Sequence, residues 1–214
     1  MGRLTVLLSA TLLLASCNGI FGGLYDTPEA AKEVRYGFVQ EDDDHCGGTI
    51  YLDIRAYDRW TYVDLHHQYV DTANIVRQQP APQEWDFALH RYDAKTHGAV
   101  VAETPLDDIG LLVASALPDG LAFVADADSQ VAVDMSQMMD GIVGYEPSDV
   151  NPALSRWMAV DMSSMPPTYT PSNRVYLVRM ADGSMAALQF TGYTDEAATK
   201  GFATIRYRYP LQVE

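Results

Sequence analysis

The chain has 214 residues, of which 48% are hydrophobic and 20% charged, a composition typical of one globular domain or at most two. Its 29 acidic residues outweigh 14 basic ones and give a net charge of −15. Such a chain lacks the basic surface that neutralises phosphates, which excludes general nucleic-acid binding. Two cysteines form neither a disulfide framework nor a structural zinc site.

The first segment in chain order is predicted to be a targeting signal. Residues 1–16 combine one basic residue with an apolar run, at 4–15, that is too short to cross a bilayer as a helix. Leu14-Ala15-Ser16-Cys17 fits the bacterial lipobox, after which the signal is cleaved and Cys17 is acylated. The alternative is a plain signal peptide with an incidental cysteine. We expect residues 1–16 to be removed and Cys17 to carry acyl chains that hold the protein durably at a membrane.

The mature chain is expected to consist of a tether and one domain. Residues 17–30 contain the lipidated Cys17 and a Gly-rich polar stretch that is typical of a flexible tether. Residues 31–214 are expected to form strands separated by turns, because β-branched and aromatic residues are enriched and several segments alternate. The predicted strands are 33–39, 48–54, 59–65, 84–92, 99–103, 121–125, 130–135, 141–145, 156–162, 174–180, 185–191 and 202–209.

The order of these segments predicts an all-β, antiparallel fold. Strands and helices do not alternate regularly, which argues against a parallel doubly wound sheet. Asp182-Gly183 between two apolar runs predicts a hairpin turn. Helix is expected to be minimal, with single turns near 152–155 and 195–199.

The sequence carries none of the common catalytic signatures. It contains no G-x-S-x-G, P-loop, G-x-G-x-x-G or H-E-x-x-H pattern, and we therefore expect a protein that is not an enzyme. Acidic clusters occur at 42–44, 107–108 and at Asp126 with Asp128. In a chain with 29 acidic residues, these clusters are expected in solvated loops.

The five histidines do not predict a metal site. His66 and His67 are adjacent, and on a strand they would point to opposite faces and could not share a metal. His45 and His97 are expected in loops or turns. His90 lies in an alternating strand-like segment, where a hydrogen-bonded structural role is expected.

Methionine is concentrated in one part of the chain. Six of the nine fall between residues 135 and 165, namely Met135, Met138, Met139, Met158, Met162 and Met165. The pattern V-D-M-S-x-M occurs at 133–138 and again at 160–165, each time after a strand-like run and before turn residues. One interpretation is that methionine fills irregular gaps in the core. The other is that two similar loops hold a flat cofactor between two thioethers, since thioether sulfur is a soft ligand for haem iron and Cu(I).

The sequence resembles the HmuY-type haem-binding lipoproteins, or haemophores, of Gram-negative anaerobes. The matching segments run in family order along nearly the whole mature chain. They are 60–62, 85–93, 167–169, 174–179, 181–183, 200–201 and 207–210. The lipobox at Cys17 agrees with the surface-lipoprotein character of that family.

The resemblance implies a mostly antiparallel two-layer sheet that binds haem, iron protoporphyrin IX, without catalysis. In the family, two loops each contribute one axial ligand, and in the founding type both ligands are histidines. Here the second ligand position falls on Met162, and no histidine follows His97. The sequence is thus similar to a bis-methionine branch. For the first ligand we choose Met135, which corresponds to Met162 in the repeated pattern, with Met138 and Met139 as alternatives.

The resemblance also implies a place in iron acquisition. A lipid-anchored protein at the outer membrane, facing the cell surface, would capture haem, with host haemoproteins as a possible source, and deliver it to a TonB-dependent outer-membrane receptor. Contact with the membrane would be through the lipid anchor alone. Met158, Ile142 and Val143 are candidates to cover the porphyrin, and Arg156 or Arg174 to bind its propionates. The alternative function is a surface glycan-binding or adhesin-type β-lipoprotein whose methionines belong to the core.

Overall fold

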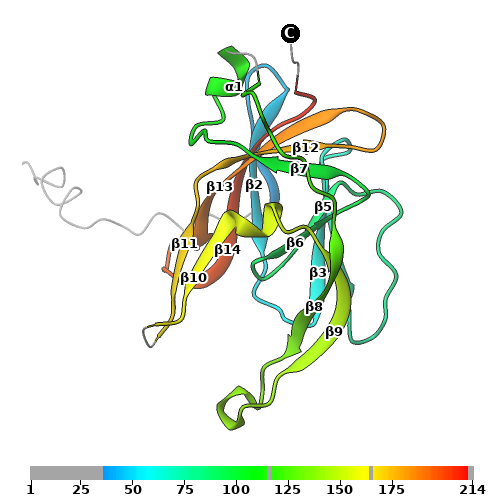
Figure 1. Cartoon of the computed structure of the whole chain (residues 1–214), viewed down its shortest axis with the longest axis vertical. Coiled ribbons are helices and arrows are strands. Elements are labelled where there is room, and N and C mark those ends of the chain that lie inside the picture. The colour runs from blue at the N-terminus through cyan, green and yellow to red at the C-terminus, as the bar shows by residue number, and fades with distance from the viewer. Residues whose placement is uncertain (1–35, 115–116, 164–165, 212–214) are drawn as a thin grey trace, which may run out of the picture. The chain divides into compact units, whose positions relative to one another are not determined.

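The computed structural model describes residues 36–114, 117–163 and 166–211. The predicted signal at 1–16, Cys17, the tether at 17–30 and Met165 lie outside these residues. As predicted, the fold is nearly all β (Figure 1). The strands are β1 (Gly37–Glu41), β2 (Gly47–Asp53), β3 (Arg59–Asp64), β4 (Tyr69–Asn74), β5 (Phe87–His90), β6 (Asp93–Thr96), β7 (Val100–Glu103), β8 (Ala127–Asp134), β9 (Gly144–Val150), β10 (Met158–Asp161), β11 (Thr168–Pro171), β12 (Val175–Arg179), β13 (Met185–Thr194) and β14 (Lys200–Arg208). The short helical segments are α1 (Leu111–Ala114), η1 (Met138–Asp140) and η2 (Leu154–Trp157).

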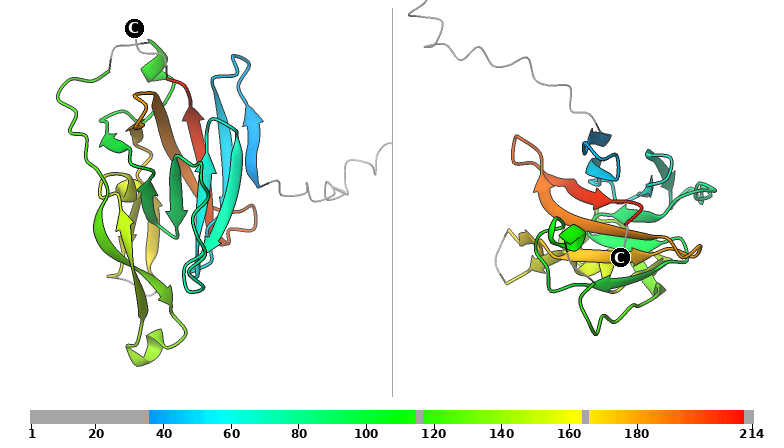
Figure 2. Two further views of the ribbon diagram at one scale, coloured as in Figure 1. Left: turned by 90° about the vertical axis from the view of Figure 1, so that its right-hand side faces the viewer. Right: turned by 90° about the horizontal axis from the view of Figure 1, so that it is seen from above.

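Two larger sheets and two ribbons make up the fold. One sheet has six strands in the order β1-β2-β14-β13-β12-β7, and the other has four in the order β4-β3-β5-β6. Strands β8 and β9 form one two-stranded ribbon, and β10 and β11 form another. Every pairing is antiparallel. In the left view of Figure 2 the β8–β9 ribbon extends well beyond the ends of the sheet strands.

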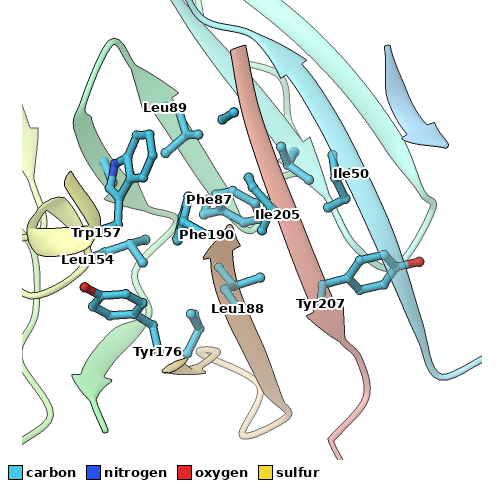
Figure 3. Close-up of a cluster of buried hydrophobic side chains, with 14 of the residues drawn as sticks. Ile50, Phe87, Leu89, Leu154, Trp157, Tyr176, Leu188, Phe190, Ile205 and Tyr207 are labelled. Carbon is cyan, nitrogen blue, oxygen red and sulfur yellow. The ribbon is translucent and has the colours of Figure 1, made fainter. Parts of the chain in front are cut away.

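The core lies between the two larger sheets. Ile50, Leu188 and Ile205 of the six-stranded sheet share one buried cluster with Phe87 and Leu89 of the four-stranded sheet (Figure 3). These side chains have no exposed surface. Removing apolar area from water is the main favourable contribution to folding, so this contact defines the two layers that the sequence predicted.

The differences from the predicted strands lie mainly at sheet edges. Strands β4 and β6 flank the four-stranded sheet, and β11 belongs to a two-stranded ribbon, and none of them was predicted. All three are short, with four to six residues each, which leaves little room for a visible alternation. The strand predicted at 121–125 is wrong, because that segment makes only one bridge, from Val124 to Val101.

The predicted turns are partly confirmed. Asp182-Gly183 joins β12 to β13, and Gly183 has a φ of +89°, a conformation that favours glycine. The helical turn expected near 152–155 corresponds to η2. The one expected at 195–199 is instead a tight turn between β13 and β14, in which the Asp195 N–H donates to the carbonyl of Thr199.

A buried segment joins the two ribbons. Between β9 and β10, neither Asn151 nor Trp157 has exposed surface. The Asn151 side-chain oxygen accepts the backbone N–H of Leu154 at 2.9 Å, and its amide donates to Asp126 Oδ1 at 2.9 Å. The Trp157 indole N–H donates to the Tyr92 carbonyl at 3.0 Å. These bonds attach the start of β10 and the end of β9 to the core.

Asp126 corrects one expectation from the sequence. It was predicted in a solvated loop, but it is half-buried and accepts hydrogen bonds from the Thr96 backbone and hydroxyl, at 2.6 and 2.9 Å, as well as from Asn151. A half-buried carboxylate that accepts this many hydrogen bonds has a structural role. It ties the segment before β8 to β6 and to the end of β9.

The β8–β9 ribbon rests on the four-stranded sheet. Buried Val131 of β8 belongs to one cluster with Trp60 and Tyr62 of β3. Lys95 of β6 contacts the same two aromatic residues, with its Nζ 4.3 Å from the Trp60 ring centroid and 3.2 Å from the Tyr62 hydroxyl. Burial lowers the pKa of Lys95 to about 8. The aromatic faces favour the charged form and offset part of the cost of burying it.

We expect the Lys95 environment to make stability rise between about pH 8 and pH 9.5. In this range the unfolded chain keeps the lysine proton that the folded protein has released, so unfolding becomes less favourable as pH increases. Lys95→Met cannot titrate and should flatten the rise in urea-denaturation free energies. Exposed Lys200→Met is the matched control and should keep it. A Lys95→Met profile parallel to that of the parent would contradict this assignment.

We also expect Asn151→Ala to destabilise the fold by about 3 kcal/mol, since each buried polar group left without a partner costs about 1–3 kcal/mol. The Leu154 N–H and Asp126 both lose a partner. Gln130→Ala, on an exposed position of β8, should change stability little. Chemical denaturation measures both variants, and equal midpoints would show that Asn151 does not stabilise the segment.

Candidate functional site

The two V-D-M-S-x-M segments occupy corresponding places in the two ribbons. Strand β8 ends at Asp134 and β10 ends at Asp161, and each is the first strand of its ribbon. Met135 and Met162 follow directly. Both ribbons run toward the same end of the fold, at the bottom of Figure 1. The predicted similarity of the two strand-to-loop corners is therefore confirmed.

The same kind of hydrogen bond forms within each of the two corners. Asp134 Oδ1 accepts the backbone N–H of Ser136 at 2.8 Å, and Asp161 Oδ1 accepts that of Ser163 at 2.8 Å. This bond lowers the pKa of Asp134, with a further contribution from the Ser136 hydroxyl. For Asp161 the Ser163 hydroxyl lowers the pKa most, followed by the backbone N–H. Each methionine thus lies between an aspartate and a serine that close the same local turn.

The methionines differ in their exposure to solvent. Met162 is 67% exposed, Met138 is 47% exposed and Met139 is 89% exposed, while Met135 is half-buried. The interpretation of these residues as core filler is wrong for the three exposed ones. Met158 is 6% exposed and belongs to the main core, where that interpretation holds.

Other apolar side chains accompany the exposed methionines on the β8–β9 ribbon. Ile142 is 57% exposed and Tyr145 is 56% exposed, and Val143 is half-buried. Met158 cannot cover a ligand at the surface because it is buried in the core. Apolar side chains gathered at a solvent-facing ribbon end mark a surface suited to an apolar ligand.

Both arginines considered for propionate binding already have protein partners. The Arg156 Nε lies 2.8 Å from Glu103 Oε2, and Arg174 donates to the Pro105 carbonyl. Neither residue belongs to a ribbon end.

The donor set at the ribbon ends fits a haem group. Thioether sulfur is neutral and soft, which suits the axial position of haem iron. The apolar side chains of Met139 and Ile142 suit the face of a porphyrin. The chemistry and exposure of these side chains therefore match both parts of the ligand, its metal and its apolar ring.

The positions predicted for the histidines are only partly confirmed. His90 is confirmed as a structural residue, because it is 1% exposed and its Nε2 lies 2.7 Å from the Tyr57 carbonyl oxygen. The prediction that His66 and His67 point to opposite faces of a strand is wrong. Both follow β3 in the turn to β4, and their ring centroids lie 4.7 Å apart.

Fold and site together define a β-sheet protein that presents thioethers on two ribbons. The chain belongs to the HmuY family: the family model described as HmuY protein matches residues 56–207. The resemblance seen in the sequence is thereby confirmed.

Solved structures support the same assignment. A Bacteroides vulgatus protein assigned as HmuY-like and heme-binding is 45% identical, with a TM-score of 0.79, covering 84% of this chain and 100% of that one. A Bacteroides fragilis protein assigned as a lipoprotein is 43% identical, with a TM-score of 0.78, covering 86% of this chain and 100% of that one. An HmuY analogue from Tannerella forsythia shares the fold at 22% identity and a TM-score of 0.63, covering 75% of this chain and 94% of its own. No curated protein matches the chain.

The shared turn generates a prediction about Asp161. Asp161→Ala removes the acceptor for the Ser163 N–H and should let Met162 move, which would weaken haem binding if Met162 is a ligand. Asp161→Asn keeps a side-chain oxygen for the same bond and should bind as the parent does. Spectroscopic haem titrations compare the variants. If both substitutions weakened binding equally, the carboxylate charge, and not the turn, would be the important property.

Proposed function

We propose that this protein is a lipid-anchored surface protein that binds haem between the ends of the β8–β9 and β10–β11 ribbons. Met135 and Met162 are the proposed axial ligands, with Met138 and Met139 as alternatives to Met135. The observation that carries the proposal is the matched Asp-Met-Ser turn at the end of β8 and of β10. Family membership supports the choice of haem.

Haem suits the site better than a bare soft metal ion. Two thioethers alone would also attract Cu(I). A bare ion, however, would leave the apolar side chains of Met139, Ile142 and Tyr145 exposed to water. A flat apolar ring covers such side chains and removes them from water.

The protein's own residues hold the ligand and perform no chemistry on it. Met135 and Met162 would hold the haem iron through their sulfurs, and thioether ligation would raise its reduction potential and favour Fe(II). Neither sulfur takes up a proton in mild acid, unlike an imidazole. The solvent-facing ribbon ends leave the ligand accessible, which suits its transfer to a TonB-dependent outer-membrane receptor for iron acquisition.

The lipid anchor complements this role. Cys17 attaches the protein to the outer membrane, and residues 17–30 separate the fold from the lipid. In the ranges that the structure describes, no helix is long and apolar enough to cross a membrane. An anchored protein of this kind stays beside its receptor at the cell surface and takes haem from solution or from host haemoproteins.

Titration of the apoprotein with haem tests ligation directly. We expect a saturable Soret band, with tighter binding when iron is reduced. Met135→Ala and Met162→Ala should each weaken binding and remove the low-spin spectrum of the reduced form. The spectrum should persist from neutral to mildly acidic pH, whereas a steep loss near pH 6.5, the usual pKa of histidine, would indicate a histidine ligand.

Met158→Ala is the matched control for these variants. Met158 is buried, so its truncation should cost about 2–5 kcal/mol of stability while the ligated spectrum remains. Loss of the spectrum only in Met138→Ala or Met139→Ala would move the first ligand to that residue. Parent-like spectra in all of the variants would contradict methionine ligation. Oligosaccharide binding without any haem spectrum would favour the glycan-binding alternative.

Membrane attachment is expected to depend on Cys17. Cys17→Ala should release the protein from the membrane fraction and abolish incorporation of labelled palmitate. Unchanged labelling and fractionation would show that the anchor lies elsewhere.

A further inference from the structure

A surface cavity of 340 Å³ is lined by residues that belong to neither ribbon. Residues of the turn after β3, of the loop before β5 and of the β12–β13 turn line it. Its ionisable side chains are Asp64, His66, His67, Glu84, Asp86, His97 and Asp182, together with Tyr209. None of these residues belongs to the proposed haem site.

Three of these side chains bring their donor atoms together. His67 Nδ1 lies 2.7 Å from Asp64 Oδ2 and 3.4 Å from Glu84 Oε2. One donor atom from each of the three residues lies within 4.8 Å of the other two. In a tetrahedral zinc site with bonds of about 2.0–2.2 Å, neighbouring donors lie about 3.3 Å apart. The His67–Glu84 distance already matches this spacing. The contact between His67 Nδ1 and Asp64 Oδ2 is a hydrogen bond, and an ion at Nδ1 would replace it, with the two atoms moving apart by about 0.6 Å.

The backbone holds this cluster in place. The Asp64 side chain is 8% exposed at the end of β3, and its Oδ1 accepts the backbone N–H of His67 at 2.8 Å. This bond fixes the turn that carries His67. The side chains of His67 and Glu84 are 54% and 74% exposed, so an ion can reach them from solvent. The cluster is therefore both preorganised and accessible.

The charge of the cavity favours a cation. Four carboxylates face it, from Asp64, Glu84, Asp86 and Asp182. Among the described residues that line the cavity, none is lysine or arginine. Negative charge gathered without a basic counter-charge attracts a divalent ion. The presence of imidazole favours a transition metal over Ca²⁺ or Mg²⁺, which prefer oxygen ligands.

We propose that Asp64, His67 and Glu84 form a binding site for a divalent transition-metal ion such as Zn²⁺. His66 lies on the same turn but is not one of the three residues whose donor atoms come together. The ion joins the β3–β4 turn to the loop before β5. An ion that binds only the folded protein raises its stability in proportion to the logarithm of ion concentration.

Calorimetry and thermal denaturation of the untagged protein with ZnCl2 test the site. We expect one Zn²⁺ per chain and a melting temperature that increases with Zn²⁺ concentration. His67→Ala and Glu84→Gln should each weaken binding at least tenfold. The matched control is His45→Ala, since His45 is also an exposed histidine beside a glutamate, 3.1 Å from Glu41, but lies outside the cavity. It should bind Zn²⁺ as the parent does.

Glu84→Gln keeps the test informative if another variant fails to fold, because Glu84 is largely exposed and far-ultraviolet circular dichroism verifies its fold. The proposal is overturned if the parent takes up no stoichiometric Zn²⁺. It is also overturned if folded Glu84→Gln and His67→Ala bind with parental affinity. Equal affinity for MgCl2 and ZnCl2 would likewise exclude a transition-metal site.

Discussion

The position of both ribbons depends on the buried segment between them. Asn151 satisfies the first turn of η2 and binds Asp126, while the Trp157 indole stacks on Phe190 with ring centroids 4.6 Å apart. Both ribbons are joined to this segment. The packing of the segment in the core therefore positions both corners, the one that carries Met135 and the one that carries Met162. A polar side chain with no exposed surface is costly unless every bond is made, so the segment tolerates few alternative arrangements.

This dependence explains which parts of the structure could be predicted. Central strands such as β2, β12 and β14 bury apolar residues in a pattern that is visible in the sequence. Edge strands β4 and β6 were missed: β4 has only one buried residue, Ala73, and β6 has only four residues, so neither shows a long apolar pattern. The role of Asp126 was missed for a different reason, since its partners Thr96 and Asn151 are 30 and 25 residues away along the chain. Contacts of that range leave no local signal.

The candidate site was predictable where it rests on a short pattern. The repeated V-D-M-S segment contains the aspartate, methionine and serine of each turn, and both turns form as the repetition indicates. The cluster of Asp64, His67 and Glu84 was not predictable, because a strand was assumed where β3 ends and a turn begins. Beyond Asp64 the chain turns, so side chains no longer alternate between two faces and their neighbours cannot be derived from strand geometry.

The length of the β8–β9 ribbon has a mechanical consequence. Val131 lies three residues before the end of β8, so four residues, or about 13 Å at about 3.3 Å per residue, separate it from Met135. The ribbon is clamped by Val131 against Trp60 and Tyr62, whereas the tip is surrounded by solvent. A rotation of about 5° at Val131 would move Met135 by only about 1 Å, given that spacing. Met135 is therefore held close to the packed part of the ribbon, whereas Met138 and Met139 lie further out at its exposed end.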